Sequence, residues 1–130
     1  MGGYLGSSSS DSIPVQFTAN LAQAAGTYDL CTASGGDVFI IDFNVYVATA
    51  GAVLTSVQIK TDQTNPVDIM SAVEGAVANL GAQKNVVIAR SQPILLRTGQ
   101  KIVYTIVGAT GSGSLVCTFV CNSRLGGRLI

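Results

Sequence analysis

The chain has 130 residues, enough for one domain with its own core, and its formal net charge is zero. Charged residues make up 11% of the sequence, against roughly 25% in an average globular domain. Seven scattered basic side chains form no cationic stripe, and no apolar run reaches the length of a membrane span, so nucleic-acid binding and membrane insertion are not expected. So few charges leave a free monomer little colloidal protection, and we expect neighbouring molecules to cover much of the surface.

Residues 1–12 are predicted to form a flexible N-terminal arm, because Gly and Ser dominate and no apolar period appears. Tyr4 and Leu5 are the apolar exceptions, and we expect them to anchor the arm to a neighbour in an assembly. The segment lacks the basic and apolar regions of a secretory signal. Gly6 stands where a myristoylation motif needs Ser or Thr, which argues against lipidation.

The N-terminal part of the sequence predicts two short strands followed by one long strand with a stronger pattern. Residues 13–17 alternate apolar and polar side chains, and Pro14, which cannot donate a backbone hydrogen bond, predicts an edge strand. Residues 27–32 form a second short strand, and residues 38–49 have the strongest period-2 pattern in the chain. The pattern predicts that one face of this third strand is a continuous core stripe. Its members are Phe39, Ile41, Phe43, Val45 and Val47.

The middle of the chain predicts further strands and one ambiguous segment. Residues 53–61 alternate as a strand, and residues 85–89 and 94–96 are shorter candidates. Residues 67–80 fit a helical period, which Gly75 interrupts. The alternative, a strand followed by a long loop, is the one that we favour.

The last third of the sequence is predicted to be a hairpin. Residues 101–107 and 115–122 are β-branched and aromatic, and a Gly- and Ser-rich stretch joins them. Residues 126–130 form a soft tail that ends in Leu129 and Ile130. Together the pattern predicts an all-β fold with little helix, a single β-sandwich of the jelly-roll or Greek-key type that spans residues 13–125.

The residues that enzymes and metal sites most need are scarce. The sequence has no histidine, which excludes Ser-His-Asp and Cys-His catalysis. Cys31, Cys117 and Cys121 lack paired zinc-site spacing, and their odd number favours reduced, buried thiols. The glycines of residues 108–114 are not followed by the Lys of a phosphate-binding loop. We therefore expect no catalytic residues, no cofactor and no metal, and a role other than that of an enzyme.

Several phrases of the sequence carry a resemblance to a known group of proteins. They are GTYDLCTASGGDVFIIDFNVYVATAGA, TSVQIKTD, SAVEGAVANLGAQKN and LLRTGQKIVYTIVGATGSGSLVCTFVC, and they lie between Gly26 and Leu125. The chain is similar here to small β-sandwich structural proteins of tailed bacteriophages. These proteins act as capsid decoration (cement) proteins or as other minor head proteins.

The resemblance implies a trimeric jelly roll or β-sandwich that is made in the host cytoplasm and binds the major capsid protein lattice on the virion surface. It assigns no binding residues. From the sequence itself, the expected assembly contacts are the apolar ends of the chain, Tyr4, Leu5, Leu129 and Ile130. The alternatives are a receptor- or glycan-binding fibre or tail module, which the scarcity of aromatic residues disfavours, and another head or tail subunit. A small hydrolase and a carbohydrate-binding sandwich are disfavoured further by the absence of tryptophan.

Overall fold

The computed structural model describes residues 12–49, 54–88, 92–122 and 126–130. Within these ranges the chain forms strands and a single 3-10 turn, η1 (Val77–Asn79). The prediction of a β-dominated fold is confirmed. The strands are β1 (Ser12–Asn20), β2 (Gly26–Ser34), β3 (Val38–Thr49), β4 (Leu54–Thr61), β5 (Asp68–Met70), β6 (Lys84–Ile88), β7 (Ile94–Leu96), β8 (Lys101–Gly108), β9 (Ser114–Asn122) and β10 (Arg128–Leu129).

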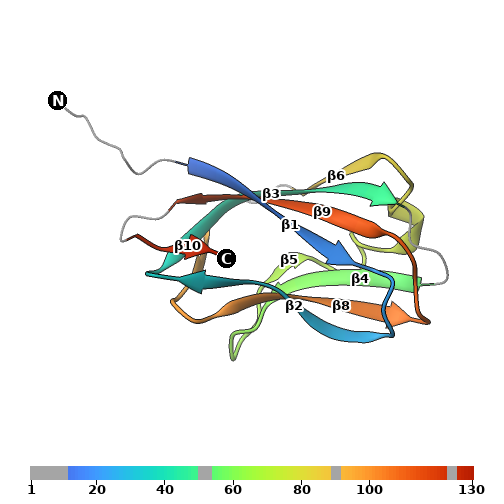
Figure 1. Cartoon of the computed structure of the whole chain (residues 1–130), viewed down its shortest axis with the longest axis horizontal. Coiled ribbons are helices and arrows are strands. Elements are labelled where there is room, and N and C mark those ends of the chain that lie inside the picture. The colour runs from blue at the N-terminus through green and yellow to red at the C-terminus, as the bar shows by residue number, and fades with distance from the viewer. Residues whose placement is uncertain (1–11, 50–53, 89–91, 123–125) are drawn as a thin grey trace.

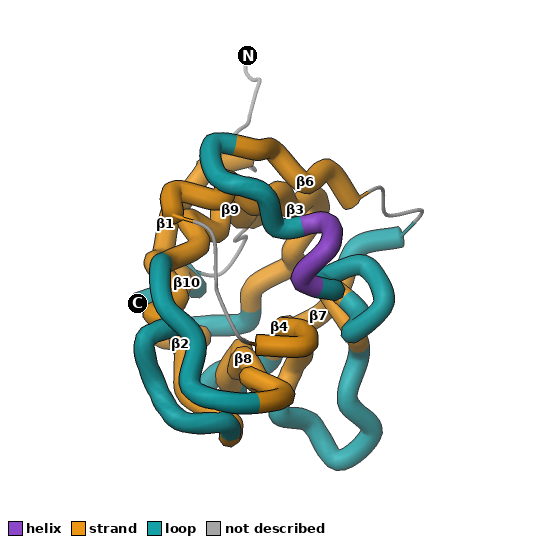
Figure 2. The backbone as a smooth tube through the Cα atoms, turned by 90° about the vertical axis from the view of Figure 1, so that its right-hand side faces the viewer, coloured by secondary structure: helices purple, strands orange, loops and turns teal. Residues whose placement is uncertain are grey.

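The strands form two antiparallel sheets that face each other (Figure 1, Figure 2). Sheet 1 has the order β1-β9-β3-β6, with β7 also paired to β3, and sheet 2 has the order β10-β2-β8-β4-β5. Consecutive strands lie in opposite sheets except for the pairs β4–β5 and β6–β7. This winding is that of a jelly roll. β1 is an edge strand, as Pro14 predicts.

The core fills the space between the sheets. Phe43 of β3 and Phe119 of β9 are both almost fully buried, with ring centroids 4.8 Å apart. Phe17 of the neighbouring β1 packs on the other side of Phe119, with centroids 6.3 Å apart. Apolar side chains of sheet 2, among them Ile59 and Ile106, close the core from below.

β3 departs from the predicted core stripe because it contains a β-bulge. Ile40 pairs with Cys121 and Asp42 pairs with Val120, so Ile41 is an extra residue with no partner on β9. The extra residue reverses the alternation of faces. Val38 and Ile40 are therefore buried before the bulge, whereas Phe43, Val45 and Val47 are buried after it. The placement of Phe39 and Ile41 in the core is wrong, since Phe39 is 39% exposed and Ile41 is half-buried.

The predicted C-terminal hairpin is also wrong. β8 pairs with β2 and β4 in sheet 2, whereas β9 pairs with β1 and β3 in sheet 1. Two strands that each bury one face can lie opposite each other across a core as well as side by side. The Gly-rich connection is long enough to cross the roughly 10 Å between packed sheets.

The structure also shows how residues 67–80 and the C-terminal tail fold. Residues 67–80 form β5, turns and η1, so the prediction of a strand followed by a loop is confirmed. The C-terminal tail is not outside the sandwich. β10 pairs with Ala33 and Ser34 of β2, and Leu129 is 6% exposed within the core cluster. The boundary of the sandwich therefore extends past residue 125, because Thr32 and Ile130 exchange two backbone hydrogen bonds of 2.9 Å.

Candidate interaction surface

The described residues contain no cluster of side chains that could bind a metal ion. Among them no group of three or more His, Cys, Asp or Glu side chains could hold a metal ion. The three cysteines are buried and free of disulfides, as the sequence predicts. Burial raises the pKa of Cys117 to about 12 and that of Cys121 to about 11, and burial together with these two neighbours raises the pKa of Cys31 further. Such thiols stay protonated and are poor nucleophiles.

The outer side of sheet 1 is the most distinctive surface of the described chain. Asp42 is the only charged side chain at its outward positions in the described strands, and the others are neutral polar or apolar. We name this surface the low-charge face. Its members are Gln16 and Thr18 of β1, Val116, Thr118 and Val120 of β9, Phe39, Asp42, Asn44 and Tyr46 of β3, and Leu95 of β7.

Strand register arranges the low-charge face in rows that cross three strands. Asn44, Thr118 and Gln16 form one row, in which Gln16 Nε2 donates to Thr118 Oγ1 over 3.3 Å. Tyr46 and Val116 belong to the next row, where Tyr46 is 37% exposed. Polar groups that bond to each other, with apolar side chains between them, form a surface that loses little solvation free energy when it is covered.

One end of the low-charge face is hollow and apolar. Phe39 and Ile41 line a cavity of about 270 Å³ together with Pro93 and Asn122. The bulge in β3 creates this feature, because it turns Phe39 outward and leaves Ile41 half-buried. The sequence pattern missed this part of the surface, since both residues continue an apparently regular apolar alternation.

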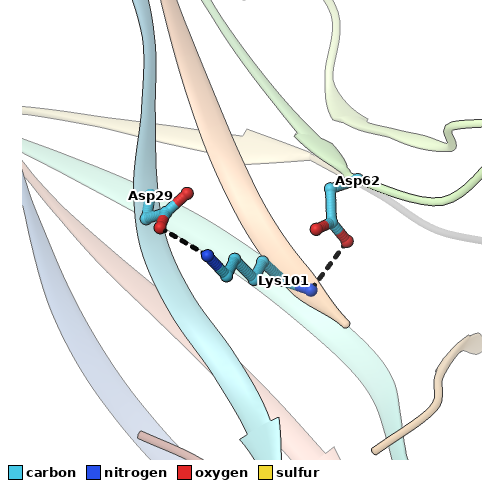
Figure 3. Close-up of polar contacts among 3 residues, drawn as sticks. All are labelled: Asp29, Asp62 and Lys101. Atoms are coloured by element: carbon cyan, nitrogen blue, oxygen red, sulfur yellow. Dashed lines mark hydrogen bonds and ion pairs between the residues drawn. The ribbon is translucent and has the colours of Figure 1, made fainter. Parts of the chain in front are cut away.

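Sheet 2 differs sharply on its outer side, where charged residues gather. Lys101 Nζ on β8 lies 2.8 Å from Asp29 Oδ2 on β2, and Lys101 N donates to Asp62 Oδ1 over 2.7 Å (Figure 3). The hydrogen bond that Lys101 Nζ donates to Asp29, together with the negative charge of Asp29, raises the pKa of Lys101. Lys60 is paired in register with Asp68, whose Oδ1 accepts from Gln58 Nε2 over 2.6 Å. This charged surface is suited to contact with water.

A second exposed apolar group lies on the loop between β5 and β6, at the end of the sandwich that faces the viewer in Figure 2. Val73 is 81% exposed. The loop is held by a reciprocal pair of hydrogen bonds, Ser71 N to Glu74 Oε1 (2.9 Å) and Glu74 N to Ser71 Oγ (3.2 Å). Asn79 Nδ2 also donates to the carbonyl of Val73. The position of Val73 is thus fixed, although the helical period of the sequence gives no sign of its exposure.

Of the four residues at the chain ends that are predicted as assembly contacts, the structure describes the two at the C-terminus. Tyr4 and Leu5 lie outside the described residues. Leu129 is buried in the sandwich and is not available to a partner. Ile130 follows it and is 59% exposed, so this residue keeps an accessible apolar side chain.

No family model, curated protein or solved structure matches the chain. In the described residues no helix has the length and apolar character needed to cross a membrane.

Proposed function

We propose that this protein is a non-enzymatic structural subunit of a tailed-bacteriophage virion, a decoration (cement) protein on the capsid surface that binds the major capsid protein lattice as a homotrimer. The sequence resemblance suggests this role, and the jelly roll is a fold that viral capsid domains use. A fold by itself does not define a function, so the proposal is based on the surface of the molecule.

The observation that carries the proposal is the unequal distribution of charge over the two sheets. The low-charge face has one carboxylate, on Asp42, whereas the Lys101–Asp29 ion pair and further charged side chains lie on sheet 2. Interface centres are depleted in charged residues and enriched in aromatic ones, because buried charges lose hydration. We infer that the low-charge face packs on a neutral, partly apolar surface of the capsid lattice while sheet 2 faces solvent. A decoration protein that binds this way stabilises the shell by mass action.

The test is binding of the purified protein to shells assembled from the major capsid protein of the phage that carries this gene. The wild-type chain is expected to sediment with the shells in a saturable manner. Tyr46→Asp places a charge in the low-charge face and should weaken binding at least tenfold, equivalent to about 1.4 kcal/mol.

The matched control is Val107→Asp. Val107 is an exposed apolar residue of β8 with 42% exposure, close to the 37% of Tyr46, but it lies in sheet 2. This variant should bind as tightly as the wild type. Equal binding by both variants would contradict the assigned face, and a wild-type chain that stays in the supernatant would contradict the capsid role.

A further inference from the structure

A small apolar hollow opens at the seam between the two sheets, where β1 begins and β10 lies, at the left-hand end of Figure 1. Its volume is about 280 Å³. Its lining includes Ile13 and Val15 of β1, Cys121 of β9, and Arg128 and Leu129 of β10. We name it the edge hollow. Its size is at the lower limit of ligand pockets, which suits one or two side chains.

The edge hollow exposes apolar surface that has no partner within the described chain. Ile13 is 57% exposed although it belongs to a strand whose neighbouring inward residues pack on the core. An apolar side chain exposed at the rim of an apolar hollow is typical of a binding site, because covering it removes both surfaces from water.

The length of the chain before β1 identifies a candidate occupant. Eleven residues precede Ser12 in the sequence, and their apolar side chains other than Met1 are Tyr4 and Leu5. Six residues, 6–11, separate Leu5 from Ser12 and contain Gly, Ser and Asp. At roughly 3.3 Å per residue, the eight steps from Ser12 back to Tyr4 can span about 26 Å, far enough to reach an adjacent molecule.

The edge of β1 disfavours occupancy by the same chain. Leu21 N donates to Gly113 O of the strand partner, so alternate residues of β1 from Ile13 onward direct their backbone groups towards β9. Pro14 then lies at a position that faces the free edge, and it has no N–H to offer. A segment that folded back from Ser12 along β1 would lose a ladder hydrogen bond there. Residues 7–10 are all Ser and lack the Asn-Gly or Asp-Gly pair that favours a tight reversal.

We propose that the edge hollow binds Tyr4 and Leu5 of a second copy of this chain, so that N-terminal segments link neighbouring subunits. The segment of one copy and the hollow of the next form a heterologous contact. Such a contact can close into a ring, as a trimer requires. This inference does not depend on capsid binding, and it is tested on the purified protein alone.

The test uses two full-length variants that disable opposite halves of the contact. The double variant Tyr4→Ser, Leu5→Ser keeps the edge hollow but lacks the apolar occupant. Ile13→Asp keeps the occupant but places a charge in the hollow, and Ile13→Ser is a milder form of the same change. In sedimentation velocity at micromolar concentration the wild type should be an oligomer and each variant a monomer. The control Val107→Asp should keep the wild-type mass.

Mixing the two monomeric variants decides between exchange and self-occupancy. The double variant supplies an intact hollow and Ile13→Asp supplies an intact segment, so exchange predicts a 1:1 complex in the mixture. Unchanged unfolding temperatures for the variants establish that each is folded. A mixture that stays monomeric would overturn the proposal in favour of occupancy within one chain, and a monomeric wild type would overturn it outright.

Discussion

Gly75 is buried beneath β4, where its carbonyl accepts a hydrogen bond from Val57 N over 2.9 Å. A Cβ atom at this position would overlap the backbone carbonyl oxygen of Val57 and would also press on the end of Met70. Backbone atoms of a paired strand cannot move as a flexible side chain can. The residue that interrupts the helical period of residues 67–80 is thus the one that lets the loop lie against sheet 2.

Gly75→Ala should therefore destabilise the fold by roughly 1–3 kcal/mol or more, because the loop must separate from β4 to make room. Urea unfolding followed by circular dichroism gives the measurement. Gly81→Ala is the matched control, since a Cβ there meets nothing within 4 Å, and its effect should stay within about 0.5 kcal/mol. Equal stability of the two variants would contradict the close approach at Gly75.

At the scale of the single strand, the bulge at Ile41 decides what β3 presents to each side. Because Ile41 has no partner on β9, the strand buries even-numbered residues before it and odd-numbered residues after it. Each half of β3 therefore contributes both to the core and to the outer side. Because of the extra residue, Phe43 enters the core, whereas Phe39, also odd-numbered but before the bulge, lies on the low-charge face.

The two phenylalanines of β3 should respond very differently to truncation. Phe43→Ala removes a ring that is 1% exposed and should cost about 3–5 kcal/mol of unfolding free energy. Phe39→Ala removes a ring that is 39% exposed and should cost less than about 1 kcal/mol. Denaturant unfolding of the pair measures the difference. A loss at Phe39 as large as that at Phe43 would mean that no bulge reverses the faces. Asp42→Asn, on the outer side, should also have a small effect.

At the scale of the whole molecule, the space between the sheets brings together thiols that are distant in the sequence. Cys31 belongs to sheet 2, whereas Cys117 and Cys121 belong to sheet 1, and all three are buried. Their folded-state pKa values lie above the roughly 8.5 of an exposed thiol. The unfolded chain therefore releases these protons at lower pH than the folded chain does.

This difference makes the free energy of unfolding depend on pH. The contribution of the buried thiols to that free energy is fully present below about pH 8.5. It is lost as the pH rises towards their folded-state pKa values, at about 1.4 kcal/mol per pH unit for each thiol. Unfolding free energies measured between about pH 8.5 and 9.5 should fall with pH. Cys117→Ala should be less stable at every pH but should show a shallower slope. An unchanged slope in this variant would mean that Cys117 titrates alike in both states.

Much of the fold was predictable from local pattern. Period-2 alternation identified the main strands, and Pro14 identified β1 as an edge, because the geometry of one strand and the missing N–H of proline are properties of a few adjacent residues. The burial of the cysteines and the absence of histidine were likewise available from the sequence.

Only the tertiary structure decided which strands pair and which side chains face outward. Alternation does not distinguish a strand beside its sequence neighbour from one across the core, so β8 and β9 resembled a hairpin although they lie in opposite sheets. Nor does it reveal a bulge, because Ile41 is as apolar as its neighbours. The sequence predicts that Leu129 lies in a tail outside the sandwich, whereas its pairing with Ala33 places it in the core. Sequence determined the strands, and long-range pairing, which depends on residues far apart in the chain, determined the surface that they build.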